Sequence, residues 1–287
     1  YEGVKKIMNL MLPALFGVSV TQINLLVDTL LASFLVAGSV SWLYFSDRLV
    51  EFPLGIFGIA LATVILPNLS KSYSAGKMED FSVSLDSGLR WVVLLGLPAA
   101  AGVFFLAQAM LTTLFQYDAF TVNDVENASL SLMAYSIGLP AFILVKVLVP
   151  AFTSRQDMRT PVKIGMIAVA SNMVMSVVLV YFLQHAGLAL ATALAAFVNA
   201  GLLLRTLFKS KVFKPQKGWA SFLVKVLLAN IAVGLIYLND YSLTQWTEWN
   251  IFDRVVHLMA EILAVFILYV VTIYLLGIRP RHLLFKG

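Results

Sequence analysis

The hydrophobic positions of the chain fall into about eight long runs with few polar residues on any face. The runs span residues 13–37, 42–69, 89–112, 129–151, 161–183, 187–208, 219–239 and 253–277. About 20 consecutive apolar residues make a helix long enough to cross the hydrocarbon core of a bilayer. The runs lack the alternation of polar and apolar residues that marks the strands of a membrane β-barrel. The pattern therefore predicts an all-α polytopic membrane protein with about eight transmembrane helices.

The composition narrows the class of protein further. Of the 287 residues, 60% are hydrophobic and 12% are charged, whereas a soluble domain has about 45–50% apolar and about 25% charged residues. So few charges cannot give a globule of this size a hydrated surface, which excludes a soluble enzyme, a disordered chain and a nucleic-acid-binding domain. We therefore expect no nucleic-acid partner. The absence of cysteine excludes disulfides and thiolate metal sites.

The loops between the runs alternate between basic ones and ones that are acidic or uncharged. The basic loops and ends carry Lys5, Lys6, Lys71, Lys77, Arg90, Arg155, Arg159, Lys163, Arg205, Lys209, Lys211, Lys214, Lys217, Arg279, Arg281 and Lys286. Because cytoplasmic loops of membrane proteins are enriched in Lys and Arg, both ends of this segment are expected to be cytoplasmic. The longest basic linker, at 209–218, predicts a six-helix lobe at 1–212 and an appended helix pair at 213–287.

Charged residues inside the second run are the strongest functional signal. Asp47, Arg48 and Glu51 are spaced so that they can share one broad helix face. An ionisable side chain at membrane depth is costly and therefore points to a function, and the planar guanidinium of Arg48 suits a phosphate group. A structural reading is also open, in which a neighbouring carboxylate neutralises Arg48 and the pair ties helices together. Pro53 and Gly55 follow directly and predict a kink that could act as a hinge beside a cavity.

A second polar group could bind a coupling ion. Asp28 lies in the middle of the first run, and Asn172 and Thr192 lie at membrane depth in the fifth and sixth runs, with Ser176 and Asn199 as further candidate partners. Oxygen ligands from several helices suit Na⁺ or a proton, so Asp28, Asn172 and Thr192 form a candidate sodium site. Two alternatives remain open: Asp28 pairs with Arg48, or the amide and hydroxyl groups only join helices by hydrogen bonds.

Other polar residues give weaker signals. Lys146, near the inner end of the fourth run, has a stem long enough to reach the headgroups. His185, His257 and His282 lie in loops or at the ends of runs, without the spacing of a metal-binding motif. No nucleophile elbow, phosphate-binding loop or dinucleotide fingerprint is present. The residues therefore favour a transporter over an enzyme, and no organic cofactor is expected.

Three groups of residues resemble one family of transporters. They are the stretch WLYFSDRLVEFPLG at 42–55 continuing to LPNLS at 66–70, the FQY triplet at 115–117 with the FT pair at 120–121, and SRQD at 154–157 with TPVK at 160–163. They are similar to motifs of the MurJ (MviN) lipid II flippases, which belong to the multidrug/oligosaccharidyl-lipid/polysaccharide exporter superfamily. The resemblance runs over almost the whole chain.

The resemblance implies a fold and a division of roles. The family has fourteen helices in two six-helix lobes and an extra pair, so the eight runs match helices seven to fourteen. The chain, which begins at Tyr1, is therefore expected to be a piece of a longer protein whose N-terminal lobe lies outside this sequence. Arg48 matches a cavity arginine that binds the lipid II diphosphate, with Asp47 and Glu51 in the same motif. Asp28, Asn172 and Thr192 are similar to a sodium site of some members, and 219–277 to a groove for the undecaprenyl tail.

The expected function is that of a lipid II flippase in the bacterial inner membrane. Such a protein moves undecaprenyl-diphosphate-linked disaccharide-pentapeptide to the outer leaflet for peptidoglycan synthesis, cell-wall organisation and cell shape. Its expected partners are lipid II, membrane lipids and the N-terminal lobe, and its expected coupling ion is sodium or a proton. The alternatives are an exporter of another polyprenyl-linked saccharide or of drugs and, less favoured, a membrane-embedded glycosyl- or acyltransferase. A cationic cavity argues against cationic drugs, and the transferase lacks an acid pair or a catalytic histidine.

Overall fold

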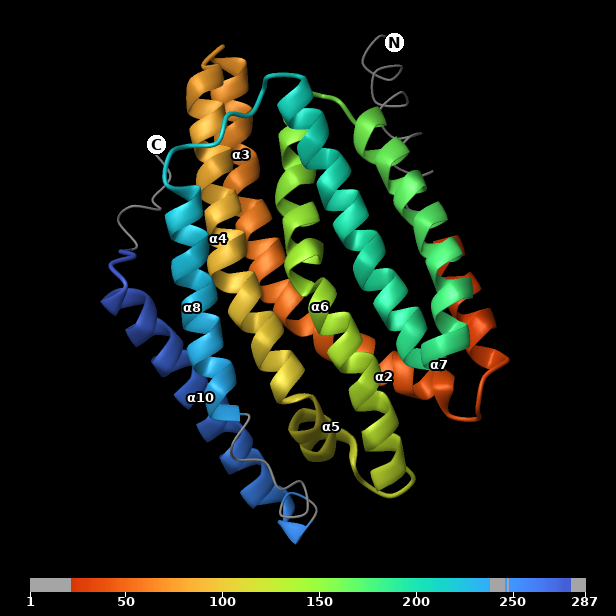
Figure 1. Cartoon of the computed structure of the whole chain (residues 1–287). Helices are drawn as coiled ribbons and strands as arrows, with labels where there is room; N and C mark the ends of the chain where they lie inside the picture. The colour runs from red at the N-terminus through yellow and green to blue at the C-terminus, as the bar shows by residue number, and fades with distance from the viewer. Residues whose placement is uncertain (1–21, 238–245, 247, 280–287) are drawn as a thin grey trace.

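The computed structural model describes residues 22–237, 246 and 248–279, and these ranges contain helices and no strand (Figure 1). A helix covers 22–33, and the rest of the first predicted run, 13–21, lies outside the described residues. The following elements are α2 (Ser39–Pro53), η1 (Leu54–Ile59), α3 (Ala60–Ser74), α4 (Met78–Phe105), α5 (Ala107–Phe115), α6 (Val122–Thr153), α7 (Arg159–Lys209), α8 (Trp219–Tyr237) and α10 (Ile251–Leu275). The predicted all-α membrane fold is confirmed.

Helix α6 is the central element of the bundle. It packs against α2, α3, α4, α5, η1 and α7, and Figure 1 shows it between α4 and α7. Its buried face carries Leu132, Leu139, Ile143 and Leu148, none of which is exposed to solvent. Because this face is apolar and closely packed, the neighbouring helices have fixed positions relative to α6.

Helix α7 consists of two arms that run in opposite directions. Gln184 has φ 51° and ψ −130°, which is not a helical conformation, and the chain reverses there (Figure 1). The next residues, His185 and Gly187, are buried, and the Gly187 Cα lies against the backbone of Leu179 and Val180, where a Cβ would clash. The two arms agree with the predicted runs 161–183 and 187–208.

The third predicted run is divided in the structure. The pattern predicts one helix over 89–112, but α4 ends at Phe105 and α5 begins at Ala107. Leu106 between them has φ −91° and ψ 7°, and it is buried. Neither Gly nor Pro marks this break, and the hydropathy stays high across it, so the sequence pattern gives no signal for it. The short α5 lies against α6 and α10.

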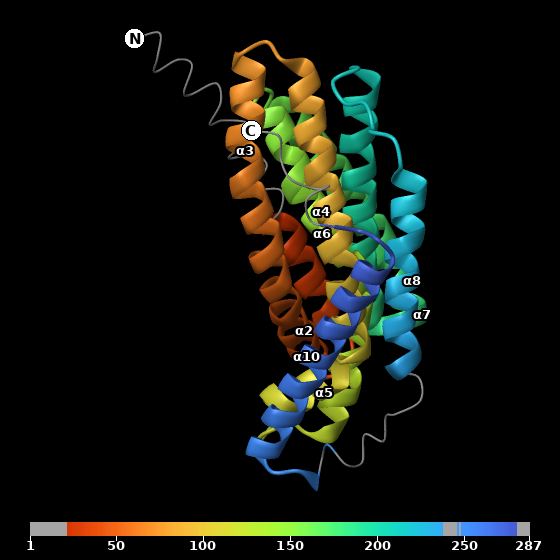
Figure 2. The ribbon, with the colours of Figure 1, turned by 90° about the vertical axis from the view of Figure 1, so that its left-hand side faces the viewer.

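Helices α8 and α10 pack together on the outer side of α4 (Figure 2). Their small core contains Leu94 of α4, Val226 and Ala229 of α8, and Tyr269 and Ile273 of α10. The Tyr269 hydroxyl donates a hydrogen bond of 2.7 Å to the Leu94 carbonyl oxygen. Helices α8 and α10 therefore pack as a pair on α4, and the predicted division into a lobe at 1–212 and an appended pair at 213–287 stays a prediction.

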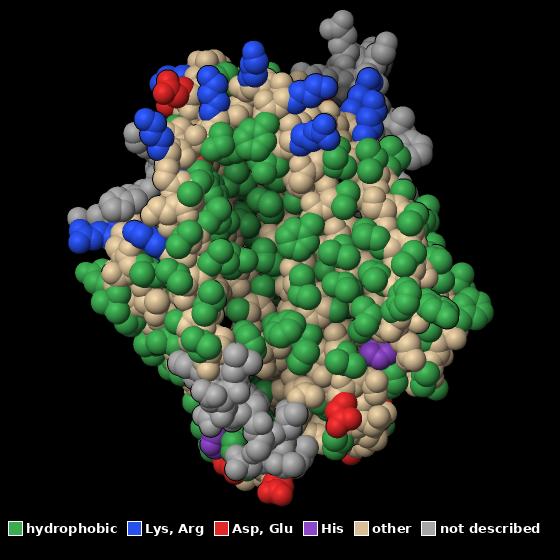
Figure 3. All heavy atoms as spheres, viewed as in Figure 1, with side chains coloured by type: hydrophobic (Ala, Val, Ile, Leu, Met, Phe, Trp, Pro, Cys, Tyr) green, Lys and Arg blue, Asp and Glu red, His purple; other side chains and the backbone are tan. Residues whose placement is uncertain are grey.

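The surface has an apolar middle and two ends of different charge. Within the described residues, five helices or helix runs are long and apolar enough to cross a membrane, Ser39–Ser74, Met78–Phe105, Val122–Thr153, Arg159–Lys209 and Ile251–Leu275, and α8 contributes the shorter apolar stretch Trp219–Leu235. Figure 3 shows Lys and Arg side chains gathered at the end formed by the α3–α4, α6–α7 and α7–α8 loops. We call this the basic end. The opposite end, with Asp118, Asp124 and Asp253, is the acidic end.

Candidate functional site

The charged cluster lies on the open face of α2. Arg48 and Glu51 form an ion pair within the helix, and their side chains are 50% and 51% exposed. The Arg48 guanidinium carbon lies 5.1 Å from the centre of the Tyr44 ring. Asp47 is half-buried beside them. Because the ion pair joins neighbouring turns of one helix, it does not tie two helices together, and the guanidinium keeps donors for a ligand.

The buried face of α2 fixes the direction of this cluster. The Ser46 hydroxyl lies 2.7 Å from the carbonyl oxygens of Trp42 and Ala128 and can donate to either. The Trp42 indole N–H donates to Asp124 at 2.8 Å, and Asp124 forms a capping box with Thr121 at the start of α6. Ser46 and Trp42 hold one face of α2 against α6. Tyr44 and Arg48 lie on the opposite face of α2, four residues apart, and they face outward.

The predicted kink coincides with an irregular helical turn. Directly after Pro53 the chain forms η1, a π-helical segment, before α3 resumes the α-helix. Proline removes a backbone donor from the helix ladder, and π turns often occur at functional sites. Figure 1 shows the helix axis changing direction between α2 and α3. The role of Pro53 and Gly55 as a hinge stays a prediction.

The structure brings the three candidate ion-binding residues into one hydrogen-bonded group. The Asn172 side-chain amide donates to Thr192 Oγ1 at 3.0 Å. The Ser176 hydroxyl lies 2.8 Å from Asn172 Oδ1 and 3.3 Å from Asp28 Oδ1, and the Asn24 amide donates to Asp28 Oδ2 at 3.1 Å. We call these five residues the polar group.

The polar group differs from the predicted site in two respects. Ser176 links Asp28 to Asn172, which gives it a central position instead of a peripheral one. Asp28 forms no ion pair with Arg48 in the described part of the chain, so that alternative is wrong. Asn172 and Ser176 are fully buried. The oxygens of one carboxylate and several neutral groups could hold a monovalent cation, but no cluster of three or more His, Cys, Asp or Glu occurs within the described ranges.

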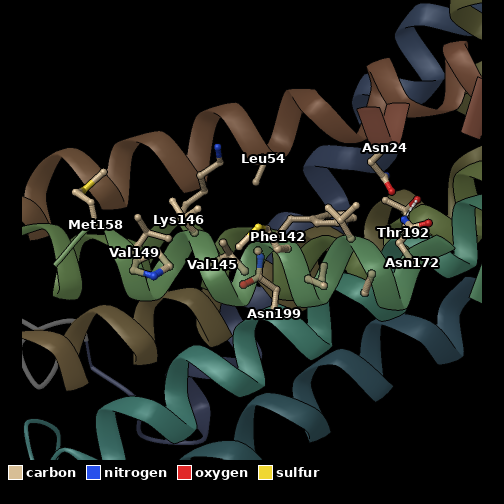
Figure 4. A pocket seen from close by; sticks show the side chains of 18 residues that line it. Asn24, Leu54, Phe142, Val145, Lys146, Val149, Met158, Asn172, Thr192 and Asn199 are labelled. Carbon is tan, nitrogen blue, oxygen red and sulfur yellow. Dashed lines mark hydrogen bonds between the residues drawn. The ribbon is translucent and has the colours of Figure 1, made fainter. Parts of the chain in front are cut away.

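A cavity of about 490 Å³ lies beside the polar group, between the helix at 22–33, η1, α6 and both arms of α7 (Figure 4). Most of its wall is apolar. The polar side chains that line it are Asn24, Lys146, Asn172, Thr192 and Asn199. Figure 4 shows Asn24, Asn172 and Thr192 together at one end of the cavity and Lys146 nearer Met158. The Lys146 side chain lies along this cavity wall, so the expectation that it only reaches the lipid headgroups explains its position less well.

The structure also contains a buried polar contact that the hydropathy pattern does not reveal. Asp86 of α4 accepts hydrogen bonds from Arg90 Nε, the Gln216 backbone N–H and Trp219 Nε1. The carboxylate is buried, and it joins α4 to the linker before α8. The spacing of Asp86 and Arg90 by four residues within a helix was the available signal.

The fold and the site define a polytopic α-helical membrane protein with cationic and polar side chains among its membrane helices. Comparison with known proteins then gives the family. The chain belongs to the lipid II flippase MurJ family, whose family model matches residues 1–257.

The relatives are considerably longer than this chain. It is 50% identical to a probable lipid II flippase MurJ of Haemophilus influenzae, an alignment that covers 100% of the chain and 57% of that protein. It is 46% identical to a probable lipid II flippase MurJ of Vibrio cholerae, over 98% of the chain and 54% of that protein. The chain therefore spans a little over half the length of these curated relatives.

Solved structures share the fold. A structure of lipid II flippase MurJ in an inward closed conformation matches 94% of this chain and 54% of its own chain, with a TM-score of 0.77 and 24% identity. An outward-facing multidrug resistance MATE family transporter of the MOP superfamily matches 80% of this chain and 52% of its own, with a TM-score of 0.62 and 18% identity. At these identities the likeness shows the fold alone.

Proposed function

We propose that this chain forms the C-terminal half of a lipid II flippase, which moves undecaprenyl-diphosphate-linked disaccharide-pentapeptide from the inner to the outer leaflet of the bacterial inner membrane. The observation that carries the proposal is the half-exposed guanidinium of Arg48 on the open face of α2. A guanidinium can bind two phosphate oxygens with parallel N–H donors, and in a water-poor cavity such charge-assisted hydrogen bonds are strong. Arg48 would release Glu51 and bind the diphosphate in its place.

Transport by this fold requires a second lobe. Alternating access is largely a rocking of two halves about a site between them. The face of α2 and η1 that carries Arg48 also exposes Tyr44, Phe52 and Ile56, which is the surface that an N-terminal lobe and the substrate would cover. The partners of this chain are therefore that lobe, lipid II and the surrounding membrane lipids.

The polar group is the proposed coupling site, for sodium or for a proton. Its ligand set supports either ion: one carboxylate from Asp28, with the neutral oxygen of Asn172 two hydrogen bonds away and that of Thr192 three hydrogen bonds away. Hard cations prefer oxygen ligands, and an intramembrane carboxylate is a common proton carrier.

The charge asymmetry supports an orientation. We infer that the basic end faces the cytoplasm, because Lys and Arg concentrate in cytoplasmic loops. A basic cytoplasmic surface also attracts anionic headgroups, which would gather the substrate at the leaflet from which it is moved.

Growth complementation tests the proposal. Arg48→Ala in the complete protein should fail to restore growth to a bacterium depleted of its own lipid II flippase, at unchanged protein level. Arg205→Ala is the matched control, because Arg205 is an exposed arginine near the basic end of α7. Full growth with Arg48→Ala would overturn the diphosphate role.

A further inference from the structure

Lys146 is a cation at membrane depth that the proposed flippase mechanism has not used. It lies in α6, seven residues before the helix ends at Thr153, which is about 10 Å along the axis. Its neighbours on both sides, Val145 and Val147, are apolar. The side chain is exposed and lines the cavity between η1, α6 and α7 (Figure 4).

The Lys146 stem lies beside Gly58 of η1. A Cβ placed on Gly58 would lie 3.4 Å from Lys146 Cγ and 3.7 Å from Lys146 Cβ. The stem therefore packs against η1. Methionine would fill this space equally well, so packing alone does not require a charge here.

No carboxylate neutralises Lys146 in the parts of the chain that the structure describes. A lysine at the centre of a membrane helix costs about 2.5–3.5 kcal/mol on insertion scales, and a lysine about 10 Å from the helix end bears part of that cost. Such a cost is offset when the cation faces a water-filled path and meets an anion there. Arg48, in contrast, already has Glu51 as its partner.

The two cations lie at different depths of the bundle. Gly58, which contacts Lys146, is ten residues after Arg48 along α2 and η1, and this separation corresponds to roughly 15 Å. Lys146 is the one nearer the basic end, and Arg48 the one nearer the acidic end. An anion that moves from the basic to the acidic end would meet Lys146 first.

We propose that Lys146 binds phosphate oxygens of the lipid-linked diphosphate on the basic-end part of the path, before the diphosphate reaches Arg48. The inference rests on the proposed flippase function and adds a second phosphate-binding residue to it. An ammonium is a compact point charge that binds phosphate without demanding one orientation. It therefore suits a first contact, and the fork of Arg48 suits the more specific one.

A binding measurement tests this role. The complete protein is purified into phosphatidylcholine nanodiscs, and its Kd for undecaprenyl diphosphate is measured for the wild type, Lys146→Met, Lys146→Arg and Arg48→Ala. Lys146→Met should weaken binding about tenfold or more, because it removes a charge-assisted hydrogen bond. Lys146→Arg should stay within roughly threefold of the wild type, because it keeps the cation.

Two controls separate this role from a general charge effect. Lys209→Met removes the same charge at an exposed position of the basic end, and it should leave the Kd unchanged. Phosphatidylglycerol, titrated in place of undecaprenyl diphosphate, should bind all variants alike. An equal loss in Lys209→Met, or an equal loss for phosphatidylglycerol, would overturn the assignment to a diphosphate at Lys146.

The remaining outcomes distinguish this inference from the function on which it rests. Wild-type affinity in Lys146→Met together with weaker binding in Arg48→Ala would overturn the role of Lys146 and leave the flippase proposal standing. Absence of binding by the wild type would contradict the proposed function, and the role of Lys146 with it. An unchanged melting temperature of Lys146→Met shows that a loss of affinity does not come from misfolding.

Discussion

The attachment of α8 to the bundle depends on the buried carboxylate of Asp86. It accepts hydrogen bonds of 2.8 Å from Arg90 Nε, 3.0 Å from the Gln216 backbone N–H and 2.7 Å from Trp219 Nε1. Arg90 in turn donates to the Lys217 carbonyl oxygen at 3.0 Å and lies over the Trp219 ring. We expect Asp86→Ala to release the linker before α8 and to weaken the packing of α8 on α4.

The contacts give the size of the effect. The Arg90 and Asp86 side chains are 15% and 3% exposed, and breaking a buried ion pair by removing one partner costs about 3–5 kcal/mol. The Gln216 backbone N–H and Trp219 Nε1 also lose their acceptor, but they lie at the basic end, where water can accept their hydrogen bonds instead. The net loss should stay near 3–5 kcal/mol. At about 2–4 °C per kcal/mol, this lowers the melting temperature by roughly 6–20 °C.

Thermal denaturation of the purified protein measures this loss. Asp80→Ala is the matched control, because Asp80 is an exposed carboxylate of the same helix whose ion pair with Lys77 is 4.0 Å long, and it should cost less than about 1 kcal/mol. Hydrogen exchange adds a local measurement: the Gln216 amide should exchange faster in Asp86→Ala. A melting temperature equal to that of Asp80→Ala, with unchanged exchange at Gln216, would refute the role given to Asp86.

Three further predictions concern the bundle and its wall. A Cβ at Gly138 would lie 2.6 Å from Ala193 Cα, so Gly138→Ala should push α6 and α7 apart and cost about 1–3 kcal/mol by denaturation; Gly102→Ala, which meets open space, should not, and equal melting would contradict this packing. If transport is faster in sodium than in choline, Asp28→Asn should abolish that difference. Transport that changes neither with Asp28→Asn nor when choline replaces sodium would remove the ion-site proposal. Arg48→Lys should restore growth only partly because lysine lacks the fork, and full growth would exclude two-donor binding.

The helices that could be predicted from the sequence are those whose apolar runs end at polar residues. The reversal of α7 at Gln184 agrees with the gap between runs 161–183 and 187–208, because Gln184 and His185 interrupt the hydropathy there. Helix ends at the surface were harder to predict. Helix α4 begins at Met78 instead of 89, since its first turns carry charges that a hydropathy pattern excludes although they are helical.

The candidate site was only partly predictable, because hydropathy reveals which residues are polar and not which ones meet. Asp28, Asn172 and Thr192 come from helices far apart in the sequence, and their connection through Ser176 depends on how α7 packs against the helix at 22–33. The same limit applies to Lys146. Its distance from the end of α6 allows it to reach the headgroups, and only the packing of α6 against η1 directs it along the cavity wall.

The proposed transport depends on Arg48 binding the lipid-linked diphosphate during its passage across the membrane. The most direct test measures the fraction of lipid II headgroups accessible at the outer face of cells that depend on the complete protein, with wild type, Arg48→Ala or Arg205→Ala as its only form. Arg48→Ala should leave the headgroups at the inner leaflet, while Arg205→Ala should match the wild type. Wild-type accessibility in Arg48→Ala cells would exclude this role of Arg48.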